Sequence, residues 1–112
     1  MYKRQVLKAA AAIADPRFGD TFRGLLRDPM WSVRCQAATG LGNIAAVESI
    51  PELSQALSDE NWWVRFNAAS SLAELGPPGR SALAQATTDA SHLRSTVASY
   101  VLQRTGLPRE AA

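Results

Sequence analysis

At 112 residues and 46% apolar content, the chain is long enough for one domain, and its net charge of +2 is too small to indicate wholesale nucleic-acid binding. The single cysteine excludes an internal disulfide, and no cluster of Cys and His has the spacing of a zinc site. The longest apolar run, residues 9–14, is far shorter than the roughly 20 residues that cross a bilayer. We expect a single domain over residues 1–112, cytoplasmic and without cofactor or metal, although an upstream signal or anchor would change that location.

Residues 3–14 form the first predicted helix. Val6, Leu7, Ala10 and Ile13 lie at helical spacing, as in the second helix of a hairpin whose first helix is missing. We therefore expect a partial repeat unit here. Its apolar flank would be covered by upstream chain or by another protomer, so self-association through this helix is one expectation.

Two matching segments follow, and every residue that they share is displaced by 31 positions. Residues 28–41 read DPMWSVRCQAATGL, and residues 59–72 read DENWWVRFNAASSL. Self-similarity at a fixed period of this size indicates stacked repeat units. The chain is therefore predicted to be a helical array.

Each matching segment contains an amphipathic helix. Residues 31–44 and 62–75 carry apolar side chains at spacings of four, four and three, which place them on one side of a helix. The two apolar stripes consist of Val33, Ala37, Leu41 and Ile44, and of Val64, Ala68, Leu72 and Leu75. Asp28 and Asp59 lie just before these helices, where a carboxylate can cap exposed amide groups.

Shorter helices precede the two longer ones. Their apolar residues lie in 22–26 and 50–57, and Pro51 is well suited to the first turn of the second. A third, weaker copy has a helix at 80–88 after a stop and turn at 76–79, and then a helix around Leu93-Arg94 and Val97-Ala98. A partial loss of the repeat pattern is typical of a terminal unit. We predict an all-α fold with repeats over residues 20–44, 48–75 and 79–104, six helices in three hairpins.

The pattern Asp, Val-Arg, Ala-Ala, Leu after a short amphipathic helix resembles the HEAT repeat, specifically the short bacterial type also seen in phycobilisome lyases. The match covers residues 22–75 with the whole pattern and 83–102 with part of it. This resemblance implies a right-handed α-α superhelix, a solenoid of about three stacked hairpins. It also implies that second helices line a concave surface, and that Asp and Arg side chains form a ladder of hydrogen bonds between adjacent units.

By position, the ladder residues are Asp28, Arg34, Asp59 and Arg65. A structural role is favoured for them over a catalytic or phosphate-binding one, because charge-assisted hydrogen bonds at a repeat junction satisfy buried polar groups. The third copy departs from the pattern, since Asp89 and Arg94 are separated by five residues instead of six.

Side chains opposite the apolar stripes are the candidates for partner contact on the concave surface. They are Cys35, Gln36, Thr39, Trp63, Phe66, Asn67, Ser70 and His92. Exposed aromatic residues often mark binding sites, and Trp63 has Ser32 as its counterpart, so the repeat does not require Trp there. Partner contact and local packing remain equally open for Trp63. Trp31 and Trp62 share an aligned position, which favours packing against the preceding turn.

The other polar candidates have ordinary interpretations as well. His92 has no acid or nucleophile at a recognisable spacing, so a solvated surface histidine is favoured over a general base. Cys35 is expected to be an inert, half-buried small residue. Neither a phosphate-cradling motif nor a nucleophile triad is present in the sequence.

A non-enzymatic scaffold that binds a protein or peptide on the concave face is therefore the leading hypothesis, since catalysis needs convergent titratable groups. Binding of nucleic acid, as in HEAT-like DNA repair glycosylases, is an alternative. It is disfavoured because the predicted floor contains no Lys or Arg to contact phosphate. A fragment similar to a bilin lyase or chaperone is a third possibility, which rests on the resemblance alone.

Overall fold

The structure is a computed structural model that describes residues 15–106, and all regular secondary structure in this part of the chain is helical. Its elements are η1 (Pro16–Phe18), α2 (Gly19–Leu25), α3 (Trp31–Asn43), η2 (Val47–Ser49), α4 (Ile50–Ala56), α5 (Trp62–Glu74), α6 (Pro77–Ala86) and α7 (His92–Gly106). The helix predicted at residues 3–14, with the self-association assigned to it, lies outside the described residues.

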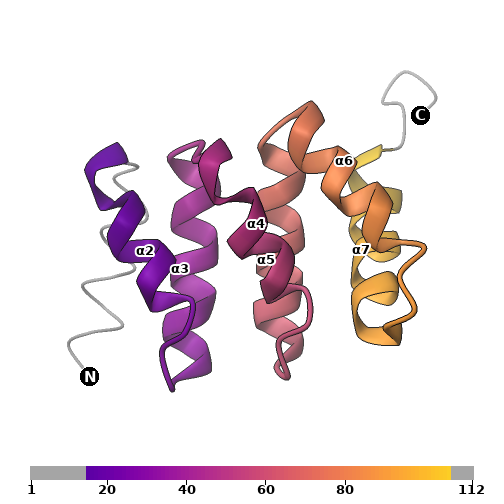
Figure 1. The fold of residues 1–112 in the computed structure, drawn as a ribbon, viewed down its shortest axis with the longest axis horizontal. Coiled ribbons are helices and arrows are strands. Elements are labelled where there is room, and N and C mark those ends of the chain that lie inside the picture. Colours follow the sequence, from indigo (N-terminus) through magenta and orange to yellow (C-terminus); the bar gives the residue numbers. More distant parts are fainter. Residues whose placement is uncertain (1–14, 107–112) are drawn as a thin grey trace.

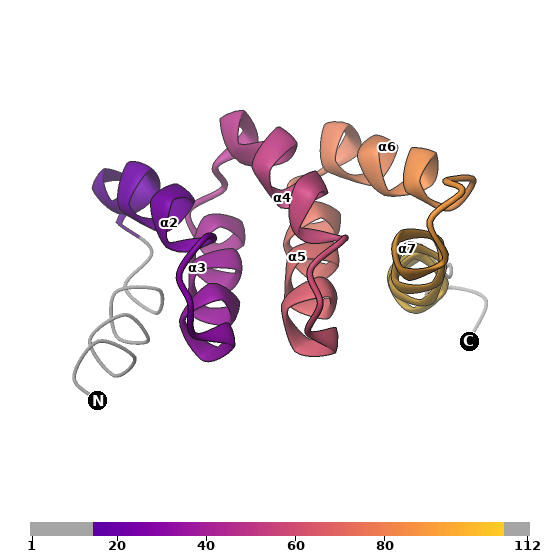
Figure 2. The ribbon, with the colours of Figure 1, turned by 60° about the horizontal axis from the view of Figure 1, so that its bottom comes forward.

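Three helical hairpins follow one another along the molecule (Figure 1): α2 with α3, α4 with α5, and α6 with α7. Figure 2 shows the first helices of the hairpins in one layer and the second helices, α3, α5 and α7, in the other. The predicted all-α solenoid of three stacked hairpins is confirmed. Within residues 15–106, none of the helices is both long and apolar enough to cross a membrane.

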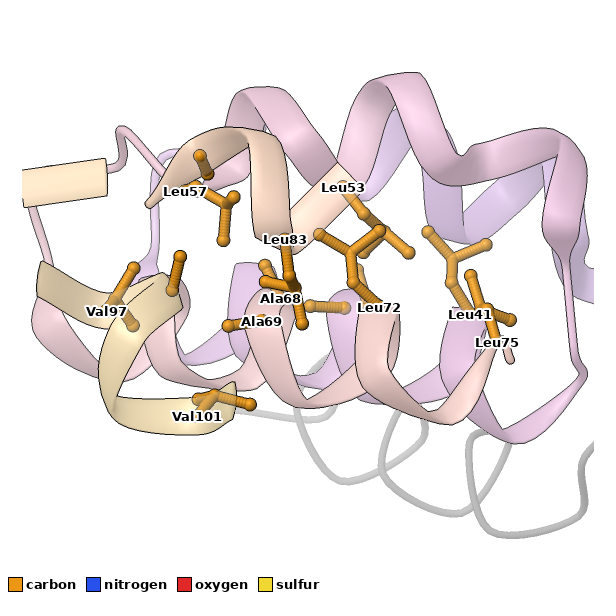
Figure 3. Close-up of a cluster of buried hydrophobic side chains, with 14 of the residues drawn as sticks. Leu41, Leu53, Leu57, Ala68, Ala69, Leu72, Leu75, Leu83, Val97 and Val101 are labelled. Carbon is orange, nitrogen blue, oxygen red and sulfur yellow. The ribbon is translucent and has the colours of Figure 1, made fainter. Parts of the chain in front are cut away.

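Apolar side chains from all three hairpins form one core between the two layers. Val33, Leu41, Val64 and Leu72, from the two predicted stripes, are fully buried. Figure 3 shows labelled side chains of this cluster from α3 to α7. Because each hairpin buries its apolar side chains partly against the next one, the units stabilise one another.

The turns before α3 and α5 are held by the two aspartates that precede them. Asp28 Oδ2 accepts a hydrogen bond from the amide of Met30 (3.0 Å), and Asp59 Oδ1 accepts one from the amide of Asn61 (2.9 Å). Both amides lie before the first helical residue. The cap of α5 is instead Asn61, whose Oδ1 accepts from the amide of Trp63 (2.8 Å). The aspartates thus shape the turns rather than cap the helices, which corrects the prediction.

The segment 76–79 was predicted to be a stop and turn, but α6 begins inside it. Gly76 precedes the helix with a φ of 80°, a backbone conformation that glycine adopts without steric cost. Pro77 and Pro78 then occupy the first helical positions, where an amide would have no partner within the helix. The two prolines therefore start α6 instead of delaying it.

Candidate interaction surface

Arg34 of α3 connects the first hairpin to the second. Its Nε and Nη2 donate to the two carboxylate oxygens of Asp59 at 2.8 and 3.1 Å, and its Nη1 donates to the carbonyl of Asp28 at 2.8 Å. The side chains of Arg34 and Asp59 are each only 12% exposed. The hydrogen bonds to Asp59 raise the pKa of the Arg34 guanidinium above its ordinary value. This contact is one rung of the kind that the resemblance to HEAT repeats implies.

The equivalent contact between the second and third hairpins is missing from the described residues. Arg65 Nη1 donates to the carbonyl of Asp59 (2.6 Å), as Arg34 does to Asp28, but Arg65 makes no bond to Asp89. Arg94 pairs with Asp89 instead, Nε to Oδ2 at 3.2 Å, within the third hairpin. Arg65 Nε is buried without a hydrogen-bond partner. Among the described residues, an Arg–Asp rung therefore joins only the first and second hairpins. Arg94 joins the third hairpin to the second through other acceptors, since its Nη1 donates to the carbonyl of Ser54 (2.6 Å) and to Ser58 Oγ (3.1 Å).

Three of the predicted contact residues meet at the junction of α3 and α5. Thr39 Oγ1 donates to Asn67 Oδ1 (3.1 Å), and Asn67 Nδ2 donates to the carbonyl of Trp63 (2.7 Å). Cys35 lies beside them and is only 7% exposed. The burial agrees with the expectation of an inert small residue, and it leaves Cys35 little surface for a partner because α5 packs against this side of α3. These polar groups join two hairpins.

Burial raises the pKa of the Cys35 thiol, and the neighbouring Asn67 side chain opposes this shift to a smaller extent. We expect iodoacetamide at pH 8 to alkylate Cys35 at least roughly tenfold more slowly in the folded chain than in guanidinium, because the reactive thiolate is scarce and shielded. The time course can be followed by mass spectrometry. Equal rates in the two conditions would show that α3 and α5 separate readily in solution.

Four aromatic side chains touch one another at the junction of α5 and α7. Phe66 lies at the centre, with ring centroids 6.2 Å from Trp62, 6.4 Å from Trp63 and 6.1 Å from Tyr100. Trp62 and Tyr100 are 5.9 Å apart. We call these four residues the aromatic belt. Trp63 is 55% exposed, Tyr100 42% and Trp62 37%, so the belt presents a continuous apolar surface to solvent.

The belt forms because large side chains replace small ones from one junction to the next. Phe66 occupies the position that Cys35 has in α3, and Tyr100 the position that Ser71 has in α5. Buried Ser71 donates to the carbonyl of Ala38 in α3 (2.6 Å), which requires a close approach of the two helices. Figure 2 shows α3 and α5 side by side, whereas α7 is turned relative to α5. We attribute this turn to the bulk of the aromatic rings.

The belt contains two residues that were not predicted as contact residues. Trp62 was expected to pack against the preceding turn, but it stacks on Phe66 and meets Tyr100 edge-on. Tyr100 was missed because it lies in the eroded third copy. Its alignment with Ser71 at an offset of 29 is the signal that could have found it. Trp31, in the position aligned with Trp62, is 47% exposed.

The remaining predicted contact residues lie outside the belt. Gln36 and Ser70 are half-buried on α3 and α5. His92 is exposed at the start of α7, with its Nε2 3.4 Å from Thr96 Oγ1. Over residues 15–106, no three His, Cys, Asp or Glu side chains come together as a metal site requires. What this surface offers is apolar contact area.

An open depression of about 390 Å³ continues from Tyr100 along α7. It is lined by Thr87, Ser95, Thr96, Ser99, Tyr100 and Gln103. None of these side chains is charged at neutral pH. The surface beside the belt is thus polar but neutral.

Comparison with known protein families finds a match that covers most of the chain. The profile of the family described as HEAT repeats matches residues 19–103, from the start of α2 into α7. No curated protein matched the chain.

Proposed function

Because the chain belongs to the HEAT repeat family, we propose that it is a non-enzymatic scaffold that binds a protein or peptide partner on the concave face formed by α3, α5 and α7. Repeat arrays of this kind generally bind other macromolecules on an extended surface. The single observation that carries the proposal is the exposure of the aromatic belt. Contiguous apolar patches are uncommon on monomeric proteins, and Trp and Tyr are enriched among residues that dominate binding energy.

Trp63 and Phe66 are the residues that we assign to the centre of the contact. Trp63 is the most exposed ring of the belt, and Phe66 contacts the other three rings. The repeat does not require either aromatic, since Ser32 and Cys35 occupy the aligned positions in α3. Asn67 and Thr39 contribute indirectly, because their hydrogen bond holds α5 against α3.

We expect the double variant Trp63→Ala, Phe66→Ala to lose at least about tenfold in capture of its partner, since removing hot-spot aromatics costs about 2 kcal/mol or more. The immobilised chain would be incubated with extract of the source cells, and captured proteins would be quantified by mass spectrometry. Trp31→Ala is the matched control, because Trp31 is a similarly exposed tryptophan on α3, outside the belt.

Circular dichroism would establish that both variants keep their helical content. Equal capture by the native chain and the double variant would contradict the proposal. Capture that disappears after nuclease treatment of the extract would assign the binding to nucleic acid instead.

A further inference from the structure

Building on the proposed function, we infer that the segment bound by the aromatic belt is an acidic peptide with large apolar side chains. The apolar side chains would contact the exposed rings. A carboxylate would pair with exposed Arg104, and half-buried Arg65 would add positive charge beside Trp62.

The two arginines lie over two rings of the belt, those of Trp62 and Tyr100. The Cζ atom of Arg65 is 5.7 Å from the ring centroid of Trp62, and that of Arg104 is 5.5 Å from the ring centroid of Tyr100. Arg104 Nη1 also donates to the Tyr100 hydroxyl at 3.4 Å. The two distances from Cζ to a ring centroid are typical of cation–π contacts. Such a contact holds a guanidinium in place without neutralising its charge.

Neither guanidinium has a carboxylate partner among the described residues. Four other arginines do: Arg17 pairs with Asp15, Arg23 with Asp20, Arg34 with Asp59, and Arg94 with Asp89. Arg65 donates only to a backbone carbonyl, and exposed Arg104 only to the Tyr100 hydroxyl. The belt is therefore an apolar surface with uncompensated positive charge beside two of its rings. An acidic, apolar segment is complementary to it in both respects.

This arrangement fits a peptide better than a nucleic acid. Aromatic rings can stack on bases, but affinity for a polyanion grows with the number of cations that contact phosphates. The depression beside Tyr100 adds only neutral side chains to this surface. Two cations can be matched by two carboxylates of a peptide, whereas a phosphate backbone on this path would leave most of its charges without a partner.

The test begins with a displayed library of random 12-residue peptides, panned against the full chain. We expect enrichment of peptides that combine Asp or Glu with Leu, Ile, Phe or Trp. One enriched peptide, labelled with fluorescein, is then titrated by anisotropy against the native chain and three variants. Arg104→Gln should raise Kd about threefold, as expected for one exposed ion pair, and Trp63→Ala about tenfold or more.

Arg27→Gln is the matched control and should leave Kd unchanged. Arg27 is an exposed arginine after α2, and no described carboxylate pairs with it. Raising the salt concentration should weaken binding to the native chain more than binding to Arg104→Gln.

Each result decides between the two proposals. Enriched peptides that require Trp63 but show no acidic excess, or bind Arg104→Gln as tightly as the native chain, would refute the acidic partner and leave the proposed function standing. If no peptide is enriched, the acidic peptide is refuted and the proposed function is decided by the capture experiment. If the enriched peptides bind Trp63→Ala as tightly as the native chain, both proposals are refuted. Displacement of the peptide by a dT oligonucleotide of higher affinity would overturn the peptide assignment in favour of single-stranded nucleic acid.

Discussion

Replacing Arg34 with alanine is expected to lower the free energy of unfolding by about 3 kcal/mol, because it breaks a largely buried ion pair between two hairpins. Both side chains of this pair are 12% exposed. The substitution leaves the Asp59 carboxylate with the amide of Asn61 as its remaining hydrogen-bond donor. It also removes the bond from Arg34 Nη1 to the carbonyl of Asp28. An unpaired charge in such a site costs more than the pair contributed when intact.

Arg65→Ala is the informative comparison, since the sequence pattern assigns Arg34 and Arg65 the same role. Arg65 keeps only a bond to the carbonyl of Asp59 and the contact with the Trp62 ring. Arg65→Ala should therefore lower the free energy of unfolding by about 1 kcal/mol, which is typical for the loss of one hydrogen bond and one cation–π contact. Urea unfolding of both variants at pH 7, followed by circular dichroism, gives the two midpoints. Identical midpoints would contradict the conclusion that Arg34 bonds to an aspartate of the next hairpin and Arg65 does not.

Gly79→Ala is expected to destabilise the chain by about 3 kcal/mol, at the upper end of the cost of overpacking. A Cβ atom at Gly79 would overlap the carbonyl oxygen of Leu72 in α5 and lie 3.0 Å from the Cβ of Leu75. The obstacle is backbone, which cannot rotate away as a flexible side chain can. Gly79 thus allows α6 to lie directly on the helix that precedes it.

Gly24→Ala is the control for this substitution. Gly24 lies in α2, and no heavy atom outside its own helical surroundings would come within 4 Å of an added Cβ. Alanine is the better helix former, so the free energy of unfolding of this variant should rise by about 0.5–1 kcal/mol. Helix propensity alone predicts the same gain at Gly79. Thermal unfolding that showed a stabilised Gly79→Ala would mean that α5 and α6 are not in contact in solution.

The architecture could be predicted from the sequence because it depends on local spacing. Side chains three and four positions apart lie on one side of a helix, so Val33, Leu41, Val64 and Leu72 could be assigned to the core from their positions alone. The same argument identified the polar sides of α3 and α5. It did not show which of these side chains a neighbouring hairpin covers.

Contacts between hairpins were decided by the tertiary structure. Trp31 and Trp62 are equivalent in the sequence, but only Trp62 meets the ring of Tyr100 in the next hairpin. Arg34 and Arg65 are equivalent as well, but only Arg34 reaches an aspartate in the next unit. Helical periodicity determines on which side of its own helix a side chain lies. The distance to the next hairpin depends on the volumes of side chains about 30 positions apart, and no pattern within a single repeat contains that information.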